Sequence, residues 1–438
     1  MKKVGTLGLV FILYFSTSGG PHTVEALVHE IGPGMAALML LLVPLLWSLP
    51  EVLIVGELSS MLPVEGGYYR WVDRAFGKFW AFQNGWLTYM YSLVDMAIYP
   101  ILFNQYLAWF VPGLGPVARW CVALGVIWAP TMINLRGAVP VGRISIVAGL
   151  FIIIGFALAS LASIPNIDHN PLMPFSNDAG RGMNGMAVGL SIALWNFIGW
   201  DNASTVEGEV HDAGRTYPRA LAITLPLVVV GYFLPLLTTL GATDWTMWKD
   251  GGWPEIVSAA VGGGTTGRIL AAWVALGGMV SALALFNALL LSYSRIPFVM
   301  AQDNLLPKMF AETDKRGTPV KAVLLAAVLY SLFALLPLGQ LVVADVVLYA
   351  LALSLEFGAL IALRKKEPTL RGSFRIPFNR AGVIVLALLP LTILFAVVVL
   401  SFRDGEYGLP AIIGAAIAIA LGPLAYKLAS MRKPQGRD

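Results

Sequence analysis

Charged residues and cysteine are both scarce in this chain of 438 residues. Asp, Glu, Lys and Arg together make up 12% of the sequence, and Cys121 is its one cysteine. A soluble domain carries roughly a quarter charged residues, so this composition excludes an ordinary soluble protein. A single cysteine also excludes a framework of disulfides. The basic residues are scattered between apolar runs and form no patch, so we expect no nucleic-acid partner.

The sequence also lacks the groups that carry catalysis or hold a cofactor. Its four histidines have no metal-ligand spacing with cysteine or with acids. These histidines are His22, His29, His169 and His211. No phosphate-cradling glycine loop, ATP-binding domain or activated nucleophile is present. We therefore expect no metal, no cofactor and no enzyme activity, and any transport must be secondary.

Long apolar runs are abundant. Hydrophobic residues make up 58% of the chain, and the mean hydropathy is +0.76. The runs are about 20 residues long, which is the length a helix needs to cross a hydrocarbon core of roughly 30 Å. We predict an all-α membrane protein with twelve transmembrane helices. Their ranges are 4–30 (broken), 35–60, 79–110, 117–134, 141–163, 185–210 (broken), 218–241, 268–295, 320–337, 341–363, 381–402 and 409–430.

The basic residues predict how the helices are oriented. If the N-terminus is cytoplasmic, all but five of the 29 basic residues fall at cytoplasmic helix ends and loops. The exceptions are Arg119, Arg181, Lys249, Arg268 and Arg403. Cytoplasmic loops of membrane proteins carry an excess of Lys and Arg, so the asymmetry places both termini in the cytoplasm. Without large loops or long tails, we expect a bacterial inner (plasma) membrane.

Two of the predicted segments contain residues that interrupt a helix. The first holds Ser-Thr-Ser-Gly-Gly-Pro at 16–21, and the second holds Ile-Gly-Trp-Asp-Asn at 198–202. In a bilayer, backbone groups freed by a break survive only where they line a cavity enclosed by protein. Paired broken helices in matching halves point to the central site of a transporter. We predict an inverted repeat of 1–163 (helices 1–5) and 185–363 (helices 6–10), followed by helices 11 and 12 at 381–430.

Acidic residues outnumber basic ones inside the predicted helices. They are Glu25, Glu51, Glu57, Asp95, Asp201, Glu207, Asp345 and Glu356. Ionisable groups within a membrane are costly and by default suggest function. An excess of carboxylates around a cavity suits a cationic substrate, protons, or both.

Asp95 is the strongest single candidate. It belongs to a polar stripe in the third segment, made by residues spaced three and four apart. The stripe consists of Thr88, Tyr91, Ser92, Asp95 and Tyr99. A stripe of this kind is costly in lipid, so it should face the interior, where it either binds substrate or forms a structural hydrogen-bond network.

Asp201 lies in the second break. There it could bind an ammonium group, exchange a proton, or cap the following half-helix. Glu25, about one turn after the first break, could compensate the helix dipole or pair locally. Glu356 shares a face with Asp345 and Tyr349 and could belong to the pocket wall or to a proton path.

Aromatic residues flank the second break. Trp195 lies one helical turn before Gly199, where it could close over an amine by cation–π contact, although a tryptophan in a helix usually serves packing. The loop at 243–267 contains three tryptophans and three consecutive glycines. It is either a lid over the outer vestibule or an interfacial tryptophan belt.

Several motifs together resemble the amino acid-polyamine-organocation (APC) superfamily over nearly the whole chain. They are Glu-Leu-Ser-Ser-Met-Leu-Pro at 57–63, Gly-Gly-Tyr-Tyr-Arg-Trp-Val at 66–72, and Ser-Arg at 294–295 with Met-Ala-Gln-Asp-Asn-Leu-Leu-Pro at 300–307. Within the superfamily, three further motifs resemble the proton-coupled polyamine uptake branch. They are Ser-Gly-Gly-Pro at 18–21, Asp-Met-Ala-Ile-Tyr-Pro at 95–100 and Trp-Asp-Asn-Ala-Ser-Thr at 200–205.

This resemblance implies a LeuT-type fold and a central amine site. Asp95, Tyr99, Asp201 and Glu356 would face the substrate, and Trp195 would be the aromatic gate. The first break departs from the Gly-Ser-Gly or Gly-Ala-Gly of amino acid carriers, which favours an amine without a carboxylate. Ile152 replaces a lysine that some proton-coupled carriers use, which moves proton coupling onto acids or removes it.

We therefore predict a secondary transporter of a small cationic amine in the lipid bilayer, most simply a polyamine taken up with protons by alternating access. The proton-coupling candidates are Asp95, Asp201 and Glu356. The predicted substrate-binding residues are Ser18, Gly19, Gly20, Glu25, Asp95, Tyr99, Gly199, Trp200, Asp201 and Glu356. An amino acid symporter or exchanger, for neutral or cationic amino acids, is the main alternative. A non-transporting amine sensor or a channel is the alternative from another class.

Overall fold

The computed structural model describes residues 3–177, 182–334, 338–401 and 408–431. Within these ranges, nine helices are long and apolar enough to cross a membrane. They span Pro33–Met61, Lys78–Phe110, Pro116–Asn134, Ala138–Asn166, Ala213–Leu240, Gly264–Gln302, Asp345–Lys366, Arg380–Val397 and Ile412–Ser430. Large apolar side chains such as Val147, Val230 and Phe395 are exposed on their outer faces, as expected where lipid replaces water. The prediction of an all-helical, multi-pass integral membrane protein is confirmed.

The shorter helices lie where the sequence predicted breaks. The first segment divides into α1 (Thr6–Thr17) and α2 (Val24–Ile31). The sixth divides into α9 (Gly182–Trp195) and the 3₁₀ helix η3 (Asn202–Glu209). Another short apolar helix, α14 (Val320–Phe333), begins where the ninth span was expected. The end of that predicted span, residues 335–337, lies outside the described residues.

The remaining helices follow the predicted spans closely. They are α3 (Pro33–Val43) with α4 (Leu49–Met61), α6 (Lys78–Phe110), α7 (Pro116–Asn134), α8 (Ala138–Ser163), α10 (Ala213–Leu240), α12 (Gly264–Tyr293), α15 (Leu338–Lys366), α16 (Arg380–Ser401) and α17 (Gly408–Ser430). Three short helices were not predicted: α5 (Gly67–Phe76), α11 (Trp253–Ala260) and α13 (Arg295–Gln302). They lie in stretches read as loops, because none is long enough to show a membrane-length apolar run.

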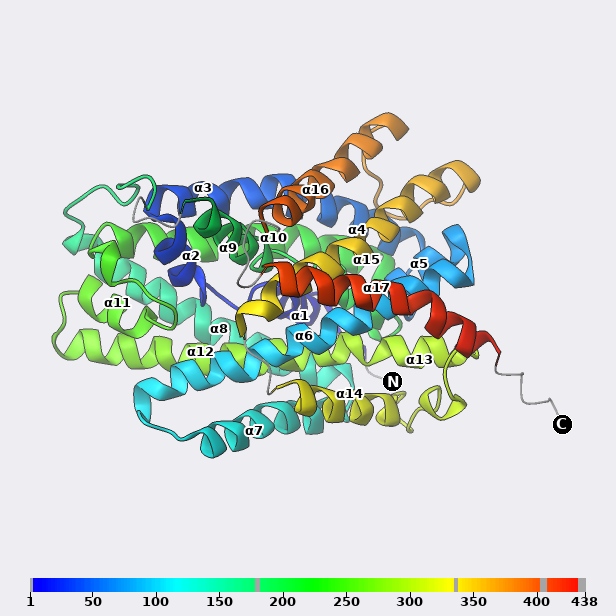
Figure 1. Ribbon diagram of the computed structural model, residues 1–438, viewed down its shortest axis with the longest axis horizontal. Helices are drawn as coiled ribbons and strands as arrows, with labels where there is room; N and C mark the ends of the chain where they lie inside the picture. Colours follow the sequence, from blue (N-terminus) through cyan, green and yellow to red (C-terminus); the bar gives the residue numbers. More distant parts are fainter. Residues whose placement is uncertain (1–2, 178–181, 335–337, 402–407, 432–438) are drawn as a thin grey trace.

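The two broken helices lie against each other in the middle of the bundle (Figure 1). At one end, Val4 and Val210 form an isolated parallel β-bridge, through bonds of 2.9 Å from Val4 N–H to the Glu209 carbonyl and 3.0 Å from His211 N–H to the Val4 carbonyl. At the breaks, a Cβ added to Gly199 would lie 2.3 Å from the carbonyl oxygen of Ser16. Only a glycine allows the two backbones to approach this closely.

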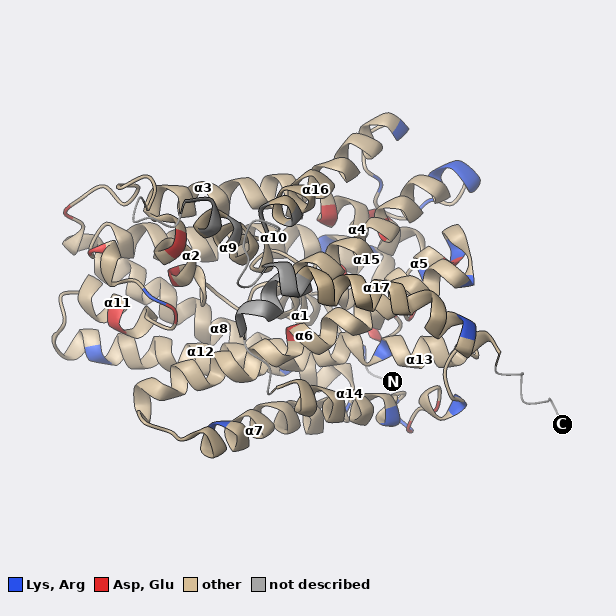
Figure 2. Cartoon of the chain, viewed as in Figure 1, with Lys and Arg blue, Asp and Glu red and all other residues tan. Residues whose placement is uncertain are grey.

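Charge is distributed unevenly along the bundle. Most Lys and Arg residues gather at the end where α5, α13 and the last turns of α15 and α17 lie, which we call the basic end (Figure 2). Ion pairs tie neighbouring elements together there. They are Arg70–Asp303 at 3.0 Å, Arg74–Glu367 at 2.6 Å and Arg364–Glu57 at 2.5 Å. The opposite end carries α2 and α11.

Candidate functional site

A small cavity lies between the two breaks. Fourteen residues from α1, α6, α9, η3, α12, α15 and the two breaks line it: Ser16, Thr17, Ser18, Tyr91, Asp95, Tyr99, Trp195, Ile198, Gly199, Asn202, Leu285, Tyr293, Asp345 and Tyr349. Its volume of about 20 Å³ leaves room for roughly one water molecule. The protein is therefore closed around this site, and a larger molecule can enter only after the helices move.

Asp95 is held firmly in the cavity wall. Its Oδ1 accepts a hydrogen bond of 2.6 Å from the Tyr99 hydroxyl, and its Oδ2 accepts one of 3.0 Å from the Tyr293 hydroxyl. Tyr91 from the same stripe donates to Asn202 Oδ1 at 3.0 Å, which joins α6 to the second break. All five residues of the predicted polar stripe are buried. The stripe therefore faces the protein interior, as expected.

Asp345 on α15 lines the same cavity but, unlike Asp95, has no hydrogen-bond partners among the described residues. Its side chain is fully buried, and within the part of the chain that the structure describes, neither carboxyl oxygen has a hydrogen-bond partner. Burying a charged or polar group without a partner is costly. Asp345 is therefore a group that a bound cation or a proton would complete. None of the described residues that line the cavity is Lys, Arg or His.

The backbone of the first break offers this cavity no free N–H at Ser18, Gly19 or Gly20, although the buried Thr17 hydroxyl in the cavity wall has no partner among the described residues. The N–H groups of Ser18 and Gly19 both donate to the Tyr14 carbonyl, at 2.9 and 3.1 Å, and the Gly20 N–H donates to Ser18 Oγ at 3.1 Å. Pro21 has no N–H. Ser18 lines the cavity, whereas Gly19 and Gly20 pack behind it, where added Cβ atoms would meet Leu285 and Ile152.

The second break is bound to Tyr349 of α15 and to the acid Glu51 of α4. The Gly199 N–H donates to the Tyr349 hydroxyl at 2.9 Å, and the Trp200 N–H donates to Glu51 Oε1 at 3.1 Å. Tyr349 also contacts Asp201 Oδ1 at 2.6 Å. Of these residues, Gly199 and Tyr349 line the cavity, and Asp201 connects to it through Tyr349.

Glu356 lies farther along α15 than Asp345 and Tyr349. Its Oε1 accepts a hydrogen bond of 3.4 Å from Asn84 Nδ2, and Asp201 and Glu51 are its acidic neighbours. Trp200 is buried, and its indole N–H donates to the Phe197 carbonyl at 2.8 Å. Neither Glu356 nor Trp200 is among the residues that line the cavity.

Trp195 lines the cavity beside Tyr99. Its ring centroid lies 6.3 Å from that of Tyr99, at an interplanar angle of 31°. Tyr99 in turn donates to Asp95, so the tryptophan packs against the partner of that acid. Its role as a gate stays a prediction.

Glu25 connects the first break to the loop at the opposite end. Its Oε1 accepts hydrogen bonds from the Tyr106 hydroxyl at 2.9 Å and from the Gly251 N–H at 3.1 Å. Trp253 Nε1 donates to the Pro21 carbonyl at 2.8 Å, and both Trp248 and Trp253 are completely buried. These contacts favour the lid interpretation of this loop over an interfacial belt.

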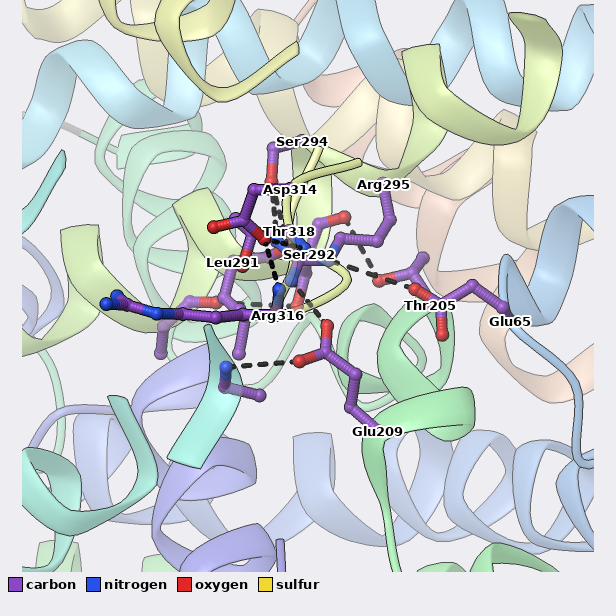
Figure 3. A network of polar contacts seen from close by, with 12 residues as sticks. Glu65, Thr205, Glu209, Leu291, Ser292, Ser294, Arg295, Asp314, Arg316 and Thr318 are labelled. Carbon is purple, nitrogen blue, oxygen red and sulfur yellow. Dashed lines mark hydrogen bonds and ion pairs between the residues drawn. The ribbon is translucent and has the colours of Figure 1, made fainter. Parts of the chain in front are cut away.

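At the basic end, a buried arginine holds several elements together (Figure 3). Arg295 at the start of α13 pairs with Glu209, and its Nε lies 3.9 Å from Glu65 Oε1. Glu209 Oε2 also accepts from the Ala138 N–H at 3.1 Å. Thr205 donates to the Ser292 carbonyl at 3.0 Å, close to this pair. The network therefore ties α13, η3, α12 and the loop before α5 together at the basic end.

The sequence did not single out several of these residues for the site. Tyr293 had no pattern that marked it. Asn202 and Arg295 stood in quoted motifs, at 198–202 and 294–295, but neither was assigned to the site. Asp345 and Tyr349 share a helical face with Glu356, and that spacing was a usable signal. Glu51 was recognised as an intramembrane acid, but nothing in the sequence showed that it would contact the second break.

These features define a class: a multi-pass membrane protein with a small, enclosed acidic cavity between two broken helices. Residues 4–419 match the Amino acid permease family. The chain belongs to this family, so it is a secondary transporter and not an enzyme. The resemblance to the APC superfamily is confirmed.

Curated relatives match over most of their length. Polyamine transporter RMV1 of Arabidopsis thaliana is 34% identical over 426 residues, which are 97% of this chain and 85% of the relative. Polyamine transporter PUT1 of Oryza sativa subsp. japonica is 35% identical over 400 residues, which are 91% of this chain and 73% of the relative.

Proposed function

We propose that this protein takes up a small amine with two or more positive charges, most simply a polyamine, together with protons. The names of both curated relatives support the substrate class. The cavity supports it independently, because Asp95 and Asp345 line it and none of the described lining residues is basic.

The observation that carries the proposal is the unpartnered carboxyl group of Asp345. An ammonium group has three donors and a full charge, so it satisfies a buried carboxylate far better than a neutral ligand. Asp95 already accepts two hydroxyl groups on the facing helix α6. An amine with several charged nitrogens could reach Asp345, Asp95 and Asp201 together once the cavity expands.

The first break argues against an amino acid as the substrate. A substrate carboxylate needs N–H donors at a helix break. The N–H groups of Ser18, Gly19 and Gly20 are all satisfied within the chain, and Asp345 would repel a carboxylate. The break therefore favours an amine that carries no acid group.

We further propose a LeuT-type arrangement of twelve spans. The nine long helices, together with the broken segments α1–α2 and α9–η3 and the short helix α14, account for twelve crossings. Residues 1–163 and 185–363 would form the two inverted repeats, and 381–430 the two added helices. The basic end would face the cytoplasm with both termini. A bacterial inner membrane stays a prediction, and the two relatives come from plants.

In this proposal, transport proceeds by alternating access. The lid at the opposite end and the Arg295 network at the basic end would open in turn around the cavity, with Trp195 as the inner aromatic gate. Ser18, Asp95, Tyr99, Gly199, Asp201 and Glu356 would bind or surround the amine. Gly19, Gly20 and Trp200 would shape the breaks, and Glu25 would hold the lid. Asp95, Asp201 and Glu356 are the candidates for proton coupling.

The test is uptake of labelled putrescine, spermidine, arginine, leucine and alanine into proteoliposomes, with and without an inward proton gradient. We expect saturable uptake of putrescine or spermidine that the gradient stimulates. Uptake of leucine or alanine, with polyamines neither entering nor competing, would overturn the amine assignment.

A variant of Asp345 sharpens this test. Asp345→Asn keeps the shape of the side chain and removes its charge. Loss of a charge-assisted hydrogen bond costs about 1.5–3 kcal/mol, so the apparent affinity for spermidine should fall about ten- to a hundredfold. The control is Asp168→Asn, which changes an acid whose side chain is 81% exposed. Equal affinity in Asp345→Asn and the control would remove Asp345 from the site.

A further inference from the structure

Glu51 is a buried acid outside the cavity, and its contacts show how a proton and an amine could be bound at the same time. Its side chain is completely buried on α4. Glu51 Oε1 lies 2.5 Å from the Tyr349 hydroxyl oxygen, and that oxygen lies 2.6 Å from Asp201 Oδ1. The hydroxyl therefore bridges an acid of the second break to an acid outside the cavity.

The number of hydrogens available at this bridge implies that one of the two acids is protonated. A tyrosine hydroxyl has one hydrogen and two lone pairs. One lone pair accepts the Gly199 N–H at 2.9 Å. Two oxygen–oxygen contacts remain, and the hydroxyl hydrogen can fill only one. The other needs a hydrogen from a carboxyl group, so Glu51 and Asp201 together hold at least one proton.

The surroundings assign this proton to Glu51. Within the described part of the chain, Glu51 Oε2 is buried without a hydrogen-bond partner, which would be costly for a carboxylate. Asp201 is the N-cap residue of η3, where the helix dipole favours a negative charge. The hydrogens then run in one direction. Glu51 donates to Tyr349, and Tyr349 donates to an ionised Asp201.

The groups facing Glu51 supply no positive charge. The titratable ones are Asp201 from the second break, Tyr349 and Glu356 from α15, and Tyr217 from α10, and the uncharged N–H groups of Trp200 and of the Trp47 indole in η1 (Pro44–Ser48) are also neighbours. None of these described groups is a base. The proton passes from one acid to the other when two hydrogens each move one step along the bridge. Glu51 gives its hydrogen to Tyr349, Tyr349 gives its own to Asp201, and the tyrosine keeps one hydrogen throughout.

The acid that holds the proton determines whether the proton and the amine can be bound at the same time or compete for one site. A proton on Asp201 would neutralise the charge that an ammonium group needs, so proton and amine would exclude each other. A proton on Glu51 leaves Asp201 charged beside the cavity. We propose that Glu51 stores the coupling proton, received from Asp201 through the Tyr349 hydroxyl, so that proton and amine are carried together. This inference rests on the proposed function.

The test compares wild type with Glu51→Gln in proteoliposomes. Glutamine keeps the size of the side chain but cannot release a proton. We expect the variant to exchange labelled putrescine for internal unlabelled putrescine, and to lose all stimulation by an inward proton gradient. External acid should instead raise its apparent KM for putrescine, because the proton now competes on Asp201. Glu312→Gln, at an exposed position of the basic end, is the matched control.

Tyr349→Phe is the second variant, in case Glu51→Gln does not fold. It keeps both acids and removes the bridge, so gradient stimulation should again disappear. Stimulation equal to wild type in either variant would overturn the inference. So would a folded Glu51→Gln protein, confirmed by gel filtration, that has lost exchange as well.

Results that contradict the proposed function would be seen in the wild-type protein and are distinct from results that contradict the role of Glu51. Wild type that takes up no putrescine or spermidine would contradict the proposed substrate. Wild type that exchanges amines without any response to the gradient would contradict proton coupling altogether, and the role of Glu51 with it. A gradient-driven wild type combined with any of the contradicting variant results above rejects the role of Glu51 and leaves the proposed function standing.

Discussion

Asp95 and Asp345 face the same cavity, but the protein has completed the hydrogen bonding of only one. Two tyrosine hydroxyls fix both oxygens of Asp95, so its position is set before any ligand arrives. Asp345 has no such partners among the described residues. The first acid therefore has a fixed position, and in the proposed function the second would supply binding energy to the group that completes it.

Gly199 is the residue on which the crossing of the two breaks depends. Its φ is +99°, and an added Cβ would lie 2.3 Å from the Ser16 carbonyl oxygen. Gly199→Ala should lower the free energy of unfolding by about 1–3 kcal/mol through backbone strain alone, and should abolish transport. The amount of protein that stays monodisperse after heating in detergent measures the first effect.

Gly231→Ala is the matched control for this substitution. Gly231 lies in α10, where an added Cβ would meet no atom within 4 Å. Wild-type heat resistance is therefore expected for Gly231→Ala. If Gly199→Ala matched it, the close contact between the breaks would not matter for stability.

Sequence patterns predicted single residues well where one helix supplied the signal. The three- and four-residue spacing around Asp95 identified a buried stripe, and the glycine and proline residues marked both breaks. The residues that contact these side chains from other helices could not be predicted from the sequence. Tyr293 contacts Asp95 across 198 positions, and Tyr349 contacts Glu51 across 298. Periodicity gives the face of a helix but not the helix that packs against it.

The lid at the opposite end depends on a small number of polar contacts. Trp253→Phe keeps an aromatic ring but removes the donor to the Pro21 carbonyl, which leaves a buried acceptor unsatisfied at a cost of about 1–3 kcal/mol. The lid should then open more often. A Ser18→Cys probe, in a Cys121→Ser background, should react faster with a membrane-impermeant maleimide.

Trp245→Phe controls for the loss of an indole in the same segment, at a half-buried position. It should leave the labelling rate of Ser18→Cys unchanged. A Trp253→Phe rate equal to this control would show that the bond to Pro21 does not hold the lid.

The network at the basic end responds to pH through Glu65, which lies in the loop between α4 and α5. The pKa of Glu65 is raised to about 7, mainly by burial, with Arg295 and Lys3 lowering it and Glu209 adding to the rise. When the network opens into water, the pKa should return toward its ordinary value of 4.5. The closed form then binds the proton more tightly than the open form. Closure is therefore favoured at low pH and weakens as the pH rises from about 4.5 through about 7.

Labelling of a Ser292→Cys probe, in the Cys121→Ser background, tests this pH dependence. The fraction of open protein should rise between pH 5 and pH 8 beyond the change in maleimide reactivity measured on a small thiol. Glu65→Gln should remove that excess, because the amide does not titrate. An excess that persists in Glu65→Gln would assign the pH dependence to another group.

Hydropathy predicted the long helices because a membrane span needs a continuous apolar run. The short helices α5, α11 and α13 were missed because each is ten residues or fewer and borders polar loops. Their positions depend on tertiary contacts, such as the hydrogen bond between Trp253 and Pro21. Short helices that are stabilised by contacts with other helices show only a weak pattern in their own sequence.

At the scale of the whole molecule, the cavity is small and enclosed. The cavity holds only about 20 Å³, and in the proposed mechanism the lid would cover it at one end and the Arg295 network at the other. A form closed on both sides is an expected intermediate of alternating access. Either closure can open without the other because they share no residue.

The number of membrane crossings and their direction predict on which side of the membrane each exposed loop lies. Asn170 and Glu312 are both exposed and are separated by three predicted spans, so they should lie on opposite sides of the membrane. Asn170 and Met247 are separated by two and should lie on the same side. In the Cys121→Ser background, Asn170→Cys and Met247→Cys should react with an impermeant maleimide on intact cells. Glu312→Cys should react only after the cells are permeabilised.

Each possible result identifies a different error. If Glu312→Cys reacted on intact cells and the other two did not, the spans would be correct and the orientation reversed. The excess of basic residues at one end would then not determine direction. If Asn170→Cys and Glu312→Cys behaved alike, the number of crossings between them would be even. In that case the broken segment α9–η3 would be the first to question, because it is the only one of the three whose halves are too short to span the bilayer alone.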